Sequence, residues 1–148
     1  MPSVTIRPAT GNDWPWIREQ LGDAGLPTAD IDRKLMKDFL VAETPQGEWV
    51  AAIGCQRYGS LGLLRSLVVA TPARDAGLGR KLVAQLERRA AAAGVLELWL
   101  LTIDAERFFA ALGYREADRR EVPRAIGETA EFSTLCPDSA HLMFKSIG

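Results

Sequence analysis

The residues best suited to chemistry form a glycine-bearing turn, Arg74-x-x-Gly77-x-Gly79, in a chain of 148 residues. An apolar run at residues 67–69 precedes the turn, and leucines at helical spacing follow it. A strand that ends in such a turn leaves the first amides of the next helix unpaired and directed together, which makes a site for phosphate oxygens. The turn therefore predicts that the chain binds a phosphorylated cofactor.

Two common phosphate loops do not fit this turn. A P-loop requires Lys and then Ser or Thr after its last glycine, whereas Gly79 is followed by Arg80, Lys81 and Leu82. A dinucleotide-binding fold requires a third glycine where Leu82 stands, and an acidic residue at the end of the next strand. The sequence thus argues against nucleotide triphosphate hydrolysis and against a dinucleotide cofactor.

A second pattern, Ala105-x-x-Phe108-Phe109-x-x-x-Gly113-Tyr114, follows the turn. Together the two patterns resemble the GCN5-related N-acetyltransferases over residues 39–115. In that family the loop amides and the helix N-terminus hold the pyrophosphate of coenzyme A. The resemblance implies acetyl-CoA as co-substrate, no metal, and a cofactor site made of Leu67, Val68, Val69, Arg74, Ala76, Gly77, Leu78, Gly79, Arg80 and Phe108.

A narrower resemblance is carried by residues 53–55, 65–69 and 131–140, and by residues 100–102 with Ala105, Phe108 and Phe109. They are similar to the acetyltransferases associated with arsenic-resistance operons, and to amino-acid N-acetyltransferases such as N-acetylglutamate synthase. The narrower resemblance implies an acceptor that is a small amino acid or an amino-acid-like toxic compound, including an organoarsenical.

Proton transfer is the step for which the sequence lacks the usual groups. Many relatives place a Glu on the strand before the loop, where this chain has Leu63, and a Tyr in the second pattern, where it has Phe109. Because a thiol is a good leaving group, the reaction does not require a dedicated acid. The substitutes are Glu131 or Glu43 as a water-mediated base, and Tyr58, Thr102 or Ser139 as a proton donor.

Arg65 is the principal candidate for acceptor binding. Its even spacing with Leu67 and Val69 predicts that it shares their face of the strand, where its guanidinium would pair with a carboxylate. A solvated arginine, or one at the edge of the core, is the alternative. Cys55 and Ser139 complete the expected acceptor site, and whether Cys55 or Cys136 contacts arsenic stays open.

The elements that must position these residues follow from periodicity and turn signals. We expect an α/β (α+β) fold: one domain over residues 1–148, with a mixed, largely antiparallel sheet of about seven strands, flanked by helices and splayed at the acetyl-CoA site. The expected strands are 4–7, 39–43, 49–55, 61–69, 96–102, an extended piece from 114 and 141–145; a turn at 45–47 makes a hairpin of the second and third, and a second turn falls at 59–60. The expected helices are 12–25, 28–37 with Thr28 as N-cap, 77–94, 104–112 with Asp104 as N-cap, and a last helix that starts within 123–129 and ends at 136–137.

Composition limits the partners. A formal net charge of -1 argues against a chain built to bind nucleic acid or an acidic membrane surface. Two cysteines, no signal-peptide pattern and no apolar stretch of membrane-spanning length predict a cytoplasmic location. A strand at the C-terminal end would suit a homodimer.

The sequence therefore predicts an acetyl-CoA-dependent N-acetyltransferase for a small-molecule amine. A non-catalytic acyl-CoA or arsenical sensor on the same fold is the first alternative, because the usual proton-transfer groups are replaced at Leu63 and Phe109. The second is a protein N-acetyltransferase.

Overall fold

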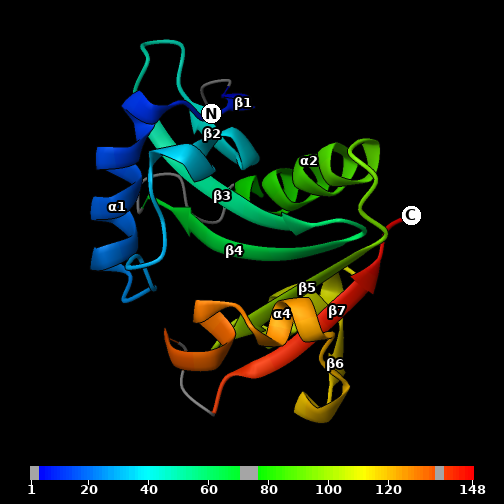
Figure 1. Cartoon of the computed structure of the whole chain (residues 1–148). Coiled ribbons are helices and arrows are strands. Elements are labelled where there is room, and N and C mark those ends of the chain that lie inside the picture. The colour runs from blue at the N-terminus through cyan, green and yellow to red at the C-terminus, as the bar shows by residue number, and fades with distance from the viewer. Residues whose placement is uncertain (1–3, 71–76, 136–138) are drawn as a thin grey trace. The chain divides into compact units, whose positions relative to one another are not determined.

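Seven strands form one mixed sheet in the order β1-β2-β3-β4-β5-β7-β6 (Figure 1). The structure is a computed structural model that describes residues 4–70, 77–135 and 139–148. Neighbouring strands run antiparallel in the pairs β1–β2, β2–β3, β5–β7 and β6–β7, and parallel in β4–β5. The predicted fold class is confirmed. The strands are β1 Thr5–Pro8, β2 Phe39–Glu43, β3 Trp49–Tyr58, β4 Leu61–Val69, β5 Glu97–Thr102, β6 Arg115–Ala117 and β7 His141–Ser146.

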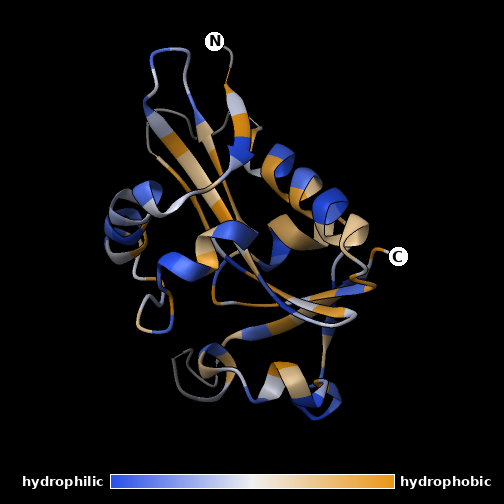
Figure 2. Ribbon diagram, turned by 45° about the horizontal axis from the view of Figure 1, so that its top comes forward, coloured by the Kyte–Doolittle hydropathy of each residue, from blue (hydrophilic) through white to orange (hydrophobic). Residues whose placement is uncertain are grey.

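The helices include several short turns. The α-helices are α1 Trp14–Asp23, α2 Leu78–Ala92, α3 Glu106–Ala111 and α4 Arg124–Gly127; the 3-10 turns are η1 Gly11–Asp13, η2 Arg33–Asp38 and η4 Arg119–Glu121; and η5, Glu131–Leu135, is a π-helical turn. The amphipathic pattern predicted for α2 is confirmed, because one stripe of it is buried, namely Leu78, Leu82, Val83, Leu86 and Ala90. Figure 2 shows polar and apolar residues alternating along this helix. Among the described residues, no helix has the length and apolar character that crossing a membrane requires.

The chain divides into two compact units. The first contains Met1–Cys55 and Ser66–Leu86, and the second contains Gln56–Arg65 and Glu87–Gly148. The elements β3, β4 and α2 each contribute residues to both units. That the whole chain is one domain stays a prediction.

The hairpin of β2 and β3 carries the core of the first unit. Its strands pair from Phe39 with Gly54 to Glu43 with Trp49, around the predicted turn. Helix α1 contributes Ile17 and Leu21 to the same core, and both are fully buried. Burial of such apolar faces is the main stabilising contribution in a small domain.

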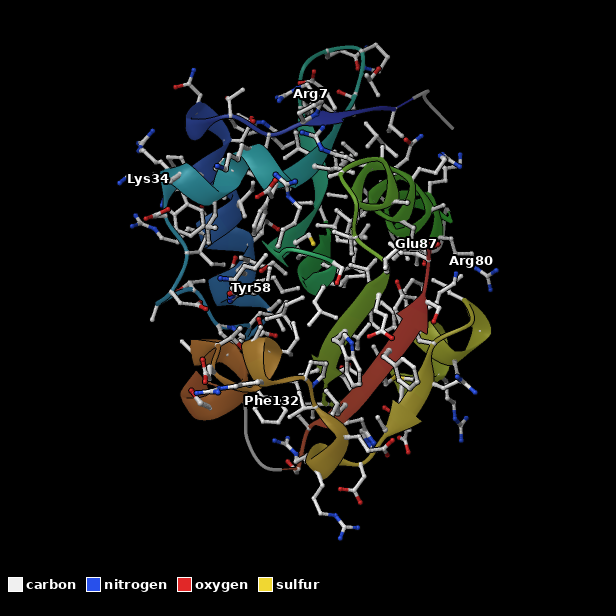
Figure 3. All side chains as sticks on the ribbon, turned by 45° about the vertical axis from the view of Figure 1, so that its right-hand side comes forward. Arg7, Lys34, Tyr58, Arg80, Glu87 and Phe132 are labelled. Carbon is white, nitrogen blue, oxygen red and sulfur yellow. The ribbon has the colours of Figure 1, made fainter. Side chains whose placement is uncertain are left out.

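A buried carboxylate, Asp13 of η1, connects this turn to β1 and β3 in the first unit. The guanidinium of Arg7 on β1, labelled in Figure 3, donates to both oxygens of Asp13 at 2.9 Å, and the Trp49 indole donates to one of them at 2.8 Å. The Thr10 amide donates at 2.7 Å, which begins η1. Burial by itself would raise the pKa of Asp13, but these hydrogen bonds outweigh it and lower the pKa from 3.8 to about 2.

Replacing this carboxylate should cost stability in a pH-dependent way. Because its folded pKa is depressed, Asp13 stabilises the fold above pH 3.8, and this contribution is lost as the pH falls through about 2. We expect Asp13→Asn to lower the free energy of unfolding by about 2 kcal/mol at neutral pH. Urea unfolding from pH 7 to 2 measures the difference, which should shrink below pH 4. Asp23→Asn, at an exposed position on α1, is the control, and an equal loss there would contradict the interpretation.

The prediction of a helix over residues 28–37 is wrong about the residue at which the helix begins. The structure has a 3-10 turn, η2, whose N-cap is Asp32 and not Thr28. One oxygen of Asp32 accepts from the amides of Lys34 and Leu35, at 2.9 and 3.2 Å. Both residue types are good N-caps, so the local pattern does not decide between them.

The second unit is built around β5 and β7. Strand β4 pairs with β5 in parallel from Leu61 with Glu97 to Leu63 with Trp99. Trp99 stacks on Phe144 of β7, with ring centroids 4.7 Å apart. The predicted splay concerns residues beyond these pairs and stays a prediction.

The second sequence pattern forms α3 and the turn after it. The N-cap of α3 is Ala105 and not the predicted Asp104; the Ala105 amide donates to the Thr102 hydroxyl at 3.0 Å. Gly113 ends the helix at φ +98°, as predicted. Lys145 Nζ, which donates to the Leu112 carbonyl at 2.8 Å, also pairs with Glu87 at 3.0 Å. Figure 3 labels Glu87 beside the C-terminal end of β7.

Candidate active site

The glycine-bearing turn leads into α2 as predicted. Gly77 has a φ of +74°, and the helix begins at the next residue, Leu78. Leu78 is buried, Gly79 is half-buried and Arg80 is exposed. Arg74 and Ala76, also predicted to bind the cofactor, lie outside the described residues. The start of α2 thus has the backbone conformation that a glycine supplies at least cost.

Strand β4, which precedes the turn, contains an irregularity at Ser66. Its φ is +62°, in the left-handed region, although it is neither glycine nor asparagine, and it is 9% exposed. Such a residue interrupts the alternation of side chains along a strand. Even spacing is therefore not sufficient to put Arg65, Leu67 and Val69 on one face, and their shared face stays a prediction. Leu67 and Val69 are half-buried, and Val68 packs in the first unit's core.

The strain at Ser66 predicts an unusual order of substitutions. Ser66→Gly and Ser66→Ala both remove the hydroxyl, but only glycine adopts this φ without a steric cost. We expect the glycine variant to be more stable than the alanine variant by about 1 kcal/mol. Thermal or urea unfolding of the two proteins measures the difference. Equal stability would mean that the strand relaxes to ordinary geometry.

Two predicted site residues, Arg65 and Glu131, meet in the second unit. The guanidinium Nε of Arg65 lies 3.0 Å from a carboxylate oxygen of Glu131, and their side chains are 1% and 6% exposed. A terminal nitrogen of Arg65 donates to Gln56 Oε1 on β3 at 3.0 Å. This burial excludes a solvated arginine, whereas an arginine with a structural role at the edge of the core stays open. A buried guanidinium is therefore held by a carboxylate and an amide.

The other candidate side chains have different surroundings. Thr102 uses its hydroxyl as the acceptor for the turn into α3, and Tyr58, labelled in Figure 3, is 37% exposed at the end of β3. Ser139 is exposed just before β7, and Cys55 is buried. Glu43 receives a hydrogen bond from Arg7 at 3.0 Å in the first unit. Cys136 lies outside the described residues.

The positions where relatives carry proton-transfer groups are apolar and buried. Leu63 is fully buried in the core of the second unit, and Phe109 is 5% exposed between the rings of Phe108 and Tyr114. Phe108 itself is half-buried. Neither position therefore carries a group that could transfer a proton.

Sequence reasoning missed Gln56 and the π-helical turn η5. Gln56 is a polar residue at the end of an apolar strand, and the predicted turn at residues 59–60 makes that strand a neighbour of β4. A polar residue on the strand next to that of Arg65 was the feature of the sequence from which this contact could have been predicted. The π turn has no comparable signal, because its extra residue per turn leaves no fixed period in five residues.

A cavity of about 550 Å³ lies in the first unit, and none of the predicted site residues lines it. It is bounded by Trp14, Arg18, Thr28, Ala29, Ile31, Asp32, Arg33 and Lys34. Within the part of the chain that the structure describes, no three His, Cys, Asp or Glu side chains are grouped to hold a metal ion.

Comparison with known proteins identifies the family. The acetyltransferase (GNAT) domain family matches residues 36–116, which is more than half of the chain. An uncharacterized N-acetyltransferase of Chlorobaculum tepidum is 32% identical over 103 residues. That match covers 69% of this chain and 63% of the relative, so the chain spans less than two thirds of it.

Two solved structures share the fold. N-acetylglutamate synthase from Neisseria gonorrhoeae, solved with coenzyme A and N-acetylglutamate, matches all of this chain but 36% of its own, with a TM-score of 0.85 and 20% identity. A protein of Mycobacterium tuberculosis solved with coenzyme A matches 96% of this chain and 98% of its own, with a TM-score of 0.79 and 21% identity. The family match covers both the glycine turn and the second pattern, and the chain belongs to the GNAT acetyltransferase family.

Proposed function

We propose that the chain is an acetyl-CoA-dependent N-acetyltransferase that acts on a small amino acid or an amino-acid-like toxic compound, organoarsenicals included. The observation that carries the proposal is the family match over residues 36–116, which contains both the glycine turn and the second pattern. The left-handed Gly77 at the start of α2 supports it, because this conformation directs amides toward a phosphate group. The fold neighbours solved with coenzyme A support the same donor.

The reaction has four requirements: a held thioester, a neutral amine, a donor for the developing oxyanion, and acceptors for two protons. To bind acetyl-CoA, which donates the acetyl group, we propose residues 67–69, Arg74, residues 76–80 and Phe108, as the resemblance implies. For proton transfer we propose Glu131, Tyr58 and Thr102, and for the acceptor Arg65, Cys55 and Ser139. A cytoplasmic location and a homodimer stay predictions.

Thiol release tests the proposal. The purified protein is incubated with acetyl-CoA and a panel of amino acids, glutamate-like toxins and organoarsenicals, and free coenzyme A is measured against time. We expect turnover with at least one amine and saturation by acetyl-CoA. Coenzyme A binding without transfer to any amine would contradict the proposal.

That contrary result would favour the second candidate, a non-catalytic acyl-CoA or arsenical sensor. The observation behind it is the burial of Leu63 and Phe109 where relatives carry proton-transfer groups. A third reading, acetylation of a protein amine, is tested by adding peptides with free N-termini or lysines to the panel.

A further inference from the structure

The ion pair between Arg65 and Glu131 is unusually buried. Its two side chains are 1% and 6% exposed, and Nε of Arg65 lies 3.0 Å from a Glu131 carboxylate oxygen. Removing two such charges from water is costly, and apolar side chains of similar size would often stabilise a fold as well or better. Stability alone therefore gives a weak reason for an ion pair at this place, and a role in binding is the alternative to consider.

The guanidinium is held from a second side. Gln56 Oε1 accepts from a terminal nitrogen of Arg65 at 3.0 Å, while Glu131 lies at Nε. If Glu131 moved away, Gln56 would still orient the guanidinium. Arginine is suited to a new carboxylate in that position because its planar donors match two oxygens.

Glu131 begins the π-helical turn η5, and two side-chain hydrogen bonds around this turn join residues 126–133 without using the Glu131 side chain. The Thr129 hydroxyl donates to the Ile126 carbonyl at 2.7 Å, and the Ser133 hydroxyl donates to the Thr129 carbonyl at 2.8 Å. Turning the Glu131 side chain breaks neither of these bonds. Single π-helical turns occur frequently at functional sites.

We propose that the pair is a receptor for the zwitterion of a free α-amino acid, an inference that rests on the proposed function. The acceptor's α-carboxylate takes the place of Glu131 at Arg65, and its ammonium pairs with the released Glu131 carboxylate. The α-carboxylate and α-ammonium of the acceptor sum to zero charge, so the net charge of the buried cluster with Arg65 and Glu131 does not change. A lysine side chain or a simple amine brings a positive charge alone, and an unbalanced buried charge is costly.

The same contact accounts for the first proton. One proton passes from the acceptor ammonium to a Glu131 oxygen, which leaves a lone pair on nitrogen for attack on the acetyl carbonyl. The nitrogen–carbon bond forms, the carbon–sulfur bond of the thioester breaks, and the second nitrogen proton joins the departing sulfur to give the free thiol. Glu131 then returns its proton to water. Glu131 is in this proposal the base that the chain lacks at Leu63.

The test compares each amino acid with its methyl ester, which keeps the amine and lacks the carboxylate. Both are offered with acetyl-CoA, and kcat/KM is measured by thiol release. For the best acceptor we expect the free acid to exceed its ester by roughly 10- to 150-fold, the value of a charge-assisted hydrogen-bonded pair. The ester's amine loses its proton more easily, so a preference for the acid must come from recognition of the carboxylate. A ratio near one, or a preference for the ester, would overturn the proposal.

Two variants separate recognition from folding. Arg65→Met/Glu131→Leu removes both charges together and should bring the acid-to-ester ratio to about one. Arg124→Met, which breaks the exposed pair with Glu128, should leave the ratio unchanged. If the double variant does not fold, the wild-type ratio alone decides.

If the proposed function is wrong, the thiol-release measurements differ from those expected when only the receptor is wrong. In that case neither acids nor esters are acetylated, and calorimetric titration with the same amino acids, without acetyl-CoA, tests the receptor. Binding of a free acid at least tenfold tighter than its ester would support the receptor without catalysis. Absence of binding would overturn it.

Discussion

Arg65→Met should lower the free energy of unfolding by about 3 to 5 kcal/mol, the usual result of removing one partner of a buried ion pair. The variant leaves the buried Glu131 side chain, 6% exposed, without the guanidinium at 3.0 Å. Arg65→Met/Glu131→Leu should recover most of the loss, because the second change removes the charge that the first one isolates. Urea unfolding of the wild type and the two variants measures this difference.

The exposed pair of Arg124 and Glu128 on α4 provides the control. Its nitrogen–oxygen distance is 2.8 Å, but its side chains are 92% and 65% exposed. Arg124→Met should therefore cost less than about 0.5 kcal/mol. If the double variant at Arg65 and Glu131 were as unstable as the single one, packing and not charge would explain the loss.

Gly54→Ala should be the most damaging small substitution in the first unit. A Cβ at this position would overlap the ring of Phe39, its direct partner on β2, contacting Cζ and Cε1 and lying 2.6 Å from Cε2. Phe39 is fully buried, so its ring has no free space to move into. We expect a loss of about 3 kcal/mol or more in the free energy of unfolding.

A second substitution and a control test the cause. Gly54→Ala/Phe39→Leu should be more stable than Gly54→Ala alone, because the shorter side chain relieves the overlap. Gly22→Ala, on α1 with no atom within 4 Å of the new Cβ, should stabilise by about 0.5 to 1 kcal/mol. A loss at Gly22 similar to that at Gly54 would show that steric overlap is not the reason.

Short sequence patterns predicted the helices and strands whose ends are set by turns. The hairpin of β2 and β3, the amphipathic helix α2 and the stop at Gly113 follow from short patterns, because glycine and apolar periodicity act within a few residues. The start of η2 at Asp32 was not predictable, since Arg33 also donates to the Gly11 carbonyl at 2.8 Å, a contact between distant residues. Tertiary contacts of this kind override local capping preferences.

The candidate site divides in the same way. The turn at Gly77 is a local feature and was predicted, whereas the left-handed Ser66 has no glycine to mark it. The pairing of Arg65 with Glu131 joins a strand to a turn far along the chain, and no spacing rule connects them. Charge alone offered several partners for Arg65, and only the fold selects one.

The tryptophans provide separate optical reporters for the two units. Trp14, Trp16 and Trp49 lie in the first unit, where Trp16 and Trp49 stack at 5.9 Å, while Trp99 lies in the second, stacked on Phe144. Indole fluorescence of a Trp99→Phe protein therefore follows the first unit alone. A protein that retains Trp99 as its single indole follows the second. Coincidence of their unfolding curves would indicate one cooperative transition, a result that the elements β3, β4 and α2, shared by both units, favour.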